Sequence, residues 1–266
     1  MTWPSSRVDA RVLSFSNAPK VTVSREVPVE TAVNVFYGEA PFAVMMTTPA
    51  DLEDFAYGFS LTEGIVASAT DVVAVTVRET QKGLELRVTL RPGLTGAKAG
   101  RERNTEGRTG CGVCGIESLD ALPLTQATGA RGGTVSTAAI KRGLDALAGA
   151  QVLNERTHAM HAAAWCTPDG AIAVLREDVG RHNALDKLIG ALLRAGRSPL
   201  DGFLVLTSRC SFEMVEKAAA FGARTVVAIS APTSMAIERA ILHDLTLVAL
   251  ARPDAALVFH GAERLT

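Results

Sequence analysis

Residues 203–250 read FLVLTSRCSFEMVEKAAAFGARTVVAISAPTSMAIERAILHDLTLVAL. Three short apolar strands and two amphipathic helices alternate along this stretch, at 203–206, 212–221, 225–229, 234–243 and 245–250. Buried strands that alternate with helices are typical of a parallel or mixed sheet covered on both faces. The stretch therefore predicts an α/β (α+β) fold for the C-terminal half of the chain.

The chain before this stretch divides into further parts. The first segment is β-rich, with strands expected at 20–35, 42–46, 72–77 and 84–90. One helix is expected after Asp51. Residues 95–109 hold Gly, Lys and Arg with almost no apolar residues, which predicts a surface loop. Helices are expected from Ser136 to about Ala150 and at 183–195, with paired strands at 162–165 and 172–175 between them. We predict a β-rich N-terminal domain, a flexible basic loop and an α/β domain, over 1–94, 95–132 and 133–266.

The composition excludes several classes of protein. The chain has 266 residues, a formal net charge of -1 and 5% aromatic residues, so it lacks the basic field and the stacking surfaces that hold a long nucleic acid. No apolar run approaches the ~18 residues of a membrane helix, and the first residues lack the pattern of a signal peptide. We therefore expect a cytoplasmic protein whose thiols stay reduced.

A C-x-x-C pair, Cys111-Gly112-Val113-Cys114, follows the basic loop and is flanked by Gly110 and Gly115. The thiolate is the nucleophilic form of cysteine, and nearby cations or free backbone N–H groups lower the pKa of a thiol from about 8.5. Arg101, Arg103 and Arg108 could supply such cations. The pattern suits a thiol that accepts sulfur from one partner as a persulfide and hands it on, and Cys114 could assist the transfer or resolve a disulfide.

Two other interpretations of the pair stay open. Zinc usually takes four ligands, and His158 with His161 could complete a set with the two cysteines. A thioredoxin-type redox motif normally opens a helix after a strand, whereas this pair follows a loop. We favour sulfur chemistry and expect no bound metal.

Two strand ends carry similar polar loops, Thr207-Ser208-Arg209-Cys210-Ser211 and Ser230-Ala231-Pro232-Thr233-Ser234. In an open α/β sheet, ligands bind at the carboxyl ends of strands, where helix N-termini present N–H groups and guanidinium groups match phosphate. We expect an anion of nucleotide type at a site formed by Ser208, Arg209, Ser211, Ser230 and Thr233. The alternative is that these hydroxyl groups only cap helices.

The most polar stretch of the chain is EDVGRHNALDK, residues 177–187, which lies between an apolar strand and an apolar helix. His182 and Asp186 are neighbours on one helix face, four residues apart. We predict that both side chains line a polar crevice and contact the ligand. The alternative is a solvated helix start.

These motifs together resemble the formate dehydrogenase accessory sulfurtransferases, the FdhD family. The resemblance covers nearly the whole chain and is carried by Thr48-Pro49, Gly58-Phe59, Thr62-Glu63-Gly64, Cys111-Gly112-Val113-Cys114-Gly115, His161-Ala162-Ala163, the 177–187 stretch, Ser211, Glu213-Met214-Val215 and Ser230-Ala231-Pro232-Thr233. It implies a sulfur carrier that takes persulfide sulfur from a cysteine desulfurase. The sulfur would go to the molybdenum cofactor in its bis(molybdopterin guanine dinucleotide) form, which formate dehydrogenase needs.

The resemblance also implies roles for particular residues. Cys111 corresponds to the persulfide carrier of the family, and the cofactor-binding stretch corresponds to Leu250, Ala251, Arg252, Pro253, Asp254 and Ala255. The C-terminal half would be similar to cytidine deaminases, and the protein would be a homodimer with no permanently bound cofactor. Asp254 and Ala255 depart from the Gly and basic residue typical of the family, and Asp254 would repel phosphate.

Two competing functions remain. A zinc-dependent deaminase-like hydrolase needs His-x-Glu and Pro-Cys-x-x-Cys, whereas this chain has His158-Ala159-Met160 and no Pro before Cys111. A non-catalytic chaperone that delivers the cofactor is compatible with the sequence.

Overall fold

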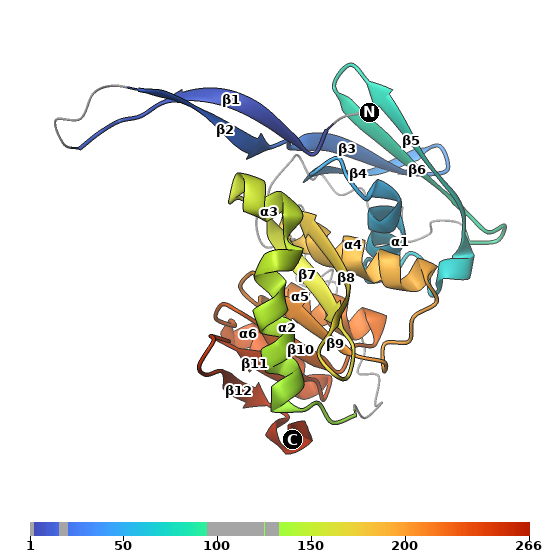
Figure 1. Cartoon of the computed structure of the whole chain (residues 1–266). Helices are drawn as coiled ribbons and strands as arrows, with labels where there is room; N and C mark the ends of the chain where they lie inside the picture. The colour runs from blue at the N-terminus through green and yellow to red at the C-terminus, as the bar shows by residue number, and fades with distance from the viewer. Residues whose placement is uncertain (1–2, 16–20, 95–124, 126–132) are drawn as a thin grey trace.

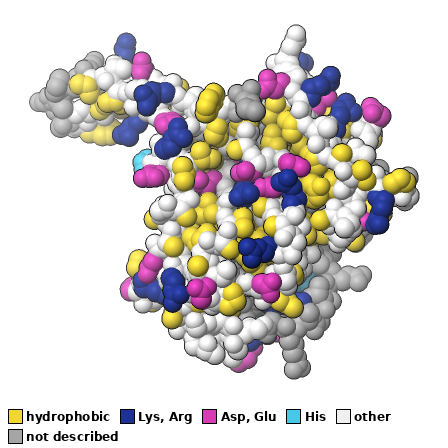
Figure 2. Space-filling view, turned by 45° about the vertical axis from the view of Figure 1, so that its right-hand side comes forward, with side chains coloured by type: hydrophobic (Ala, Val, Ile, Leu, Met, Phe, Trp, Pro, Cys, Tyr) yellow, Lys and Arg dark blue, Asp and Glu magenta, His cyan; other side chains and the backbone are white. Residues whose placement is uncertain are grey.

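The computed structural model describes residues 3–15, 21–94, 125 and 133–266. Within these residues the strands form three sheets, which Figure 1 shows with their helices. The first is a two-stranded antiparallel arm of β1 (Ser5–Arg11) and β2 (Thr22–Pro28), which extends away from the rest of the molecule. Figure 2 shows that acidic and basic side chains are interspersed on one face of the molecule.

The second sheet has four strands in the order β4-β3-β6-β5. They are β3 (Thr31–Tyr37), β4 (Ala40–Thr47), β5 (Val72–Thr80) and β6 (Gly83–Leu90). Helix α1 (Leu52–Thr62) covers the sheet, and Phe55 and Phe59 of α1 share a core with Val33 and Leu86. The predicted strand at 20–35 is in fact two strands, because the chain leaves β2 at Pro28, which has no N–H to continue a ladder.

The third sheet has six strands in the order β12-β11-β10-β9-β7-β8. β9 (Phe203–Leu206), β10 (Thr225–Ala228) and β11 (Thr246–Ala249) are parallel. β7 (His161–Cys166), β8 (Ile172–Asp178) and the edge strand β12 (Leu257–His260) complete the sheet through antiparallel pairs. The predicted mixed sheet in the C-terminal half is therefore confirmed.

Helices cover both faces of this sheet. Helices α4 (Arg181–Arg194), α5 (Phe212–Phe221) and α6 (Ser234–Leu242) pack on one face, where Trp165, Leu204 and Leu206 are buried. Helix α2 (Thr137–Ala150) packs on the other face against Phe203 and Val205. A short helix, α3 (Val152–Thr157), links α2 to β7.

Helices α1 and α4 join the two halves of the molecule through a close crossing. A Cβ atom on Gly58 would lie 1.8 Å from the backbone oxygen of Asp186, and one on Gly190 would lie 1.8 Å from that of Asp54. Only glycine at both positions allows this approach of the two backbones. Among the described residues, no helix has the length and apolar character needed to cross a membrane.

Candidate functional site

Three loops lie side by side at the carboxyl edge of the parallel strands. The N–H of Cys210, after β9, donates to the carbonyl of Ala231, after β10, at 3.2 Å. The N–H of Leu250, after β11, donates to the carbonyl of Ser230, also at 3.2 Å. The two polar loops expected from the sequence are thus adjacent, and the stretch from Leu250 to Ala255 joins them.

The antiparallel strand β7 brings His161 to the same edge. The N–H of Ala162 donates to Oγ1 of Thr207 at 2.8 Å, and the N–H of Thr207 donates to the carbonyl of Ala162 at 3.1 Å. On the other side His161 pairs with Asp178, the last residue of β8. The start of α4 at Arg181 follows directly.

A basic cluster, consisting of His161, Arg181, His182 and Arg209, forms at this edge. Burial lowers the pKa of His161, and the nearby charges of Arg181, His182 and Arg209 lower it further, while Asp178 opposes them. The neutral imidazole is therefore favoured at pH 7, and the cluster keeps a positive potential from its guanidinium groups. An anionic ligand would be attracted to such a cluster.

The predicted ligand residues of the two loops differ in their surroundings. Arg209 is exposed, whereas Ser208 is buried and its hydroxyl donates to the carbonyl of Arg209 at 3.0 Å. Thr233 caps α6, since its Oγ1 accepts from the N–H of Ala236 at 3.2 Å. Ser211 is at the N-cap of α5 without capping it through its side chain, and Ser230 is half-buried. Capping thus accounts for Thr233, which is also exposed, and Arg209 is the exposed cationic side chain of the two loops.

The 177–187 stretch is largely an interior network. Asp178 is fully buried and accepts from Nζ of Lys187 at 2.6 Å, from the hydroxyl of Thr47 at 2.5 Å and from the N–H of Thr48 at 3.0 Å. The side chain of Lys187 is also fully buried, and its Nζ donates to the carbonyl of Thr48 at 2.9 Å. These bonds tie the end of β4 to α4, so this part of the stretch holds the fold together.

The position of Asp186 does not fit the predicted contact with a ligand. Its side chain is 1% exposed and accepts from Nζ of Lys217 at 2.9 Å and from the hydroxyl of Thr62 at 2.7 Å. The reason is that α1 packs over this face of α4, which closes the expected crevice. His182 faces the edge and has a partner in the buried Glu213, with 3.0 Å between Nε2 and Oε2.

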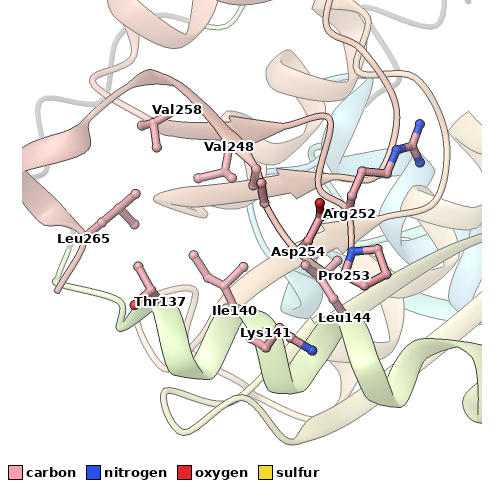
Figure 3. Close-up of a pocket in the computed structure, with 12 residues that line it drawn as sticks. Thr137, Ile140, Lys141, Leu144, Val248, Arg252, Pro253, Asp254, Val258 and Leu265 are labelled. Atoms are coloured by element: carbon pink, nitrogen blue, oxygen red, sulfur yellow. The ribbon is translucent and has the colours of Figure 1, made fainter.

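A pocket of about 230 Å³ lies between α2 and the loop that joins β11 to β12. Figure 3 shows Ile140 and Leu144 of α2 facing this loop, with Val248 and Val258 on the strands. Arg252, Pro253, Asp254 and Ala255 of the expected cofactor-binding stretch belong to its lining. Sequence patterns did not indicate this pocket, because α2 is distant in the chain and its apolar residues have the spacing of any core helix.

The four cysteines differ in what the structure says of them. Cys111 and Cys114 lie outside the described residues. Cys166 and Cys210 are buried, and burial raises the pKa of each thiol to about 12. These two are therefore poor nucleophiles. The residues that the structure describes contain no cluster of three or more His, Cys, Asp or Glu side chains arranged for a metal ion.

Comparison with known proteins identifies the family. The model of the FdhD/NarQ family matches residues 28–266. The chain belongs to the FdhD/NarQ family.

Relatives within the FdhD/NarQ family are similar over most of their length. A protein named sulfur carrier protein FdhD from Xanthomonas euvesicatoria pv. vesicatoria is 44% identical over 271 residues, which cover 100% of this chain and 96% of the relative. A protein of the same name from Bordetella petrii is 42% identical over 244 residues, covering 92% and 88%. The arm formed by β1 and most of β2 precedes the part of the chain that the family model matches.

A solved structure supports the fold. The crystal structure of a formate dehydrogenase accessory protein from Desulfotalea psychrophila superposes with a TM-score of 0.77 and 22% sequence identity, over 98% of this chain and 99% of the other. At this identity the likeness shows a common fold.

Proposed function

We propose that this chain is a sulfur carrier for the maturation of formate dehydrogenase. Cys111 would take sulfur from a cysteine desulfurase, and Cys114 would assist. The acceptor would be the molybdenum cofactor in its bis(molybdopterin guanine dinucleotide) form. The names of the relatives support the sulfur-carrier role. The carboxyl edge of the parallel strands, which carries the basic cluster and the loop from Leu250 to Ala255, supports an anionic, nucleotide-type acceptor, and we call it the ligand edge.

One observation carries the acceptor half of the proposal. The basic cluster and the loop from Leu250 to Ala255 lie along one edge of one sheet. Guanidinium groups suit the phosphates of a dinucleotide, and the apolar pocket beside Arg252 has room for a planar ring. The carboxylate of Asp254 also lines this pocket and would repel a phosphate group. We therefore assign phosphate binding to Arg209 and Arg252.

The sulfur chemistry follows from thiolate nucleophilicity. The Cys111 thiolate attacks the outer sulfur of the donor persulfide, the S–S bond of the donor breaks, and the desulfurase cysteine leaves as a thiolate. Cys111 then carries the outer sulfur as a persulfide and offers it to the bound acceptor. The reaction belongs in the cytoplasm, where free thiols persist, and a homodimer is expected from the family resemblance.

Persulfide formation tests the role of Cys111. After incubation with a cysteine desulfurase and cysteine, mass spectrometry should find one added sulfur on the Cys111 peptide. Cys111→Ala should lose it, and the matched variant Cys114→Ala should keep it on Cys111. Sulfur retained in similar amount by Cys111→Ala would contradict the assignment, and rescue of formate dehydrogenase activity by this variant would favour a non-catalytic chaperone.

Nucleotide binding tests the acceptor site separately. Arg209→Ala should weaken the binding of GDP about tenfold or more, because a charge-assisted contact to phosphate is lost. Arg78→Ala, an exposed arginine on β5, is the matched control and should bind as the unchanged protein does. Equal affinities of the two variants for GDP would show that Arg209 does not contribute to the site. A separate metal analysis that found stoichiometric zinc in the purified protein would favour the hydrolase alternative.

A further inference from the structure

A single carboxylate stands in the lining of the pocket between α2 and the β11–β12 loop. The walls of this pocket are mostly apolar side chains of α2 and of the two strands, among them Ile140, Leu144 and Val258. Asp254 is the one acidic residue among the described residues that line the pocket, and it is exposed. In a mostly apolar pocket, the few polar groups fix the orientation of a ligand and its specificity. Asp254 is therefore in a position to select what binds.

The backbone of the loop that carries Asp254 is held in place. The N–H of Arg252 donates to the carbonyl of Ala255 at 2.8 Å, which closes a turn that contains Pro253 and Asp254. The ring of Pro253 restricts its own φ to about −65°. Figure 3 shows this loop across the pocket from α2. Because the turn is formed before a ligand binds, little ordering of the loop opposes binding.

The two cations of the lining have other directions or partners. Nζ of Lys141 donates to both carboxylate oxygens of Asp145, at 2.6 Å each, one turn further along α2. Arg252 is exposed, and Figure 3 shows its guanidinium group directed away from α2. Within the part of the chain that the structure describes, the carboxylate of Asp254 is thus left for a ligand.

The chemistry of a carboxylate decides which base it fits. A carboxylate offers two acceptor oxygens and no donor, so it matches a ligand edge with two adjacent N–H donors. Among the common nucleobases guanine alone presents such an edge, formed by N1–H and the amino group on C2. Adenine and cytosine place a ring-nitrogen acceptor beside their amino group, and uracil and thymine have one N–H between two carbonyl groups. The carboxylate therefore favours guanine.

Arg252 and Asp254 together orient a bound nucleotide. The guanidinium group attracts phosphate and the carboxylate repels it, so the phosphates are expected toward Arg252 and the base toward Asp254. The apolar side chains of Ile140 and Leu144 suit the faces of the base. Each part of the nucleotide then has a matching partner on this loop or on α2.

We propose that Asp254 determines the base specificity of this pocket, because its carboxylate accepts hydrogen bonds from N1–H and from the C2 amino group of guanine. The proposal rests on the nucleotide-type acceptor proposed above and assigns the residue that recognises its base. A base without these donors would leave the carboxylate desolvated and without a partner. We expect GDP to bind about tenfold more tightly than IDP, which lacks the amino group, and about a hundredfold more tightly than ADP.

Substitution by asparagine should change the preferred base. The amide of Asn offers one acceptor and one donor, which match N1–H and the C2 carbonyl group of xanthine. Asp254→Asn should therefore bind XDP about tenfold more tightly than GDP, the reverse of the unchanged protein. Asp254→Ala should bind GDP and ADP with similar affinity. Asp201→Asn, at an exposed aspartate before β9, is the matched control and should still prefer GDP.

Calorimetric titration of the full chain with GDP, IDP, ADP and XDP measures all of these affinities. A general loss of structure would weaken the binding of every nucleotide, whereas the exchange of GDP for XDP in Asp254→Asn requires a direct contact with the base. Equal affinities of the unchanged protein for GDP and ADP, or a preference of Asp254→Asn for GDP, would overturn the role of Asp254 and leave the acceptor site standing. If the unchanged protein bound none of the four nucleotides, the nucleotide-type acceptor of the proposed function would fail as well.

Discussion

His161 lies beside Arg181, His182 and Arg209 at the ligand edge, and burial together with these neighbours lowers its pKa. The unfolded chain, with the ordinary histidine pKa of about 6.5, takes up the proton more readily than the folded chain. Stability is therefore full above that pH and decreases as the pH falls below about 6.5. The loss ends once the pH is below the lowered pKa of the folded state.

The protonation of the His161 imidazole should change when an anion binds. A phosphate near His161 favours the charged imidazole, so we expect GDP binding near pH 6.5 to be accompanied by proton uptake. Calorimetric titration in buffers of different ionisation enthalpy measures this uptake. His161→Asn should abolish it. Binding without any proton uptake in the unchanged protein would place the phosphates away from His161.

Asp178 and Lys187 illustrate a polar pair whose role is structural. Asp178→Ala leaves the ammonium group of Lys187 buried without its carboxylate partner, and we expect a loss of about 3–5 kcal/mol of unfolding free energy. Asp145→Ala, which breaks an exposed pair with Lys141 on α2, should cost less than about 0.5 kcal/mol. Denaturant titration measures both, and a small loss for Asp178→Ala would mean that the network adds little to the fold.

The sequence located the 177–187 stretch as an unusual polar segment but could not show which side chains are buried. Asp178 and Asp186 have partners on β4, α1 and α5, such as Thr47 and Lys217, and these contacts are not visible in a local pattern. His182 and Arg209 could be selected because they follow strand ends of a recognisable α/β repeat. The contacts of Thr125 with Glu216 and Arg239 had no sequence signal, since both side chains have the spacing of ordinary helix residues.

Helices α1 and α4 cross where two glycines meet, and this crossing is open to a direct test. Gly58→Ala and Gly190→Ala each place a Cβ atom 1.8 Å from a backbone oxygen, so a helix must shift, at a cost of about 1–3 kcal/mol or more. Gly149→Ala in α2 meets nothing within 4 Å and should stabilise the protein by roughly 0.5–1 kcal/mol. If Gly58→Ala unfolded at the same denaturant concentration as the unchanged protein, the crossing would not depend on close backbone contact.

The elements of residues 203–250 were predicted to within one residue at each end, because buried strands and amphipathic helices alternate there without interruption. The strands β1 and β12 and the helix α3 were missed. None of the three contains a buried residue, so none carries an apolar period. Short exposed elements take their conformation from neighbours rather than from their own pattern.

Among the described residues, the molecule has three buried hydrophobic clusters, one beside the four-stranded sheet and one on each face of the six-stranded sheet. The four-stranded sheet and the six-stranded sheet have separate buried clusters, yet α1 packs on α4 and Asp178 bonds to Thr47 and Thr48. We expect the two halves to unfold in one transition, with equal calorimetric and van't Hoff enthalpies. Two resolved transitions would show that the division predicted at 94 and 133 is also a thermodynamic one.

The ligand edge has a consequence for inhibitors. From β7, which carries His161, to β11, which precedes Arg252, the edge crosses three strand spacings, or about 14 Å. A fragment bound in the apolar pocket and an anion bound at the basic cluster would not compete for space. Joining two such weak compounds with a linker of matching length should therefore give a binder much tighter than either one alone.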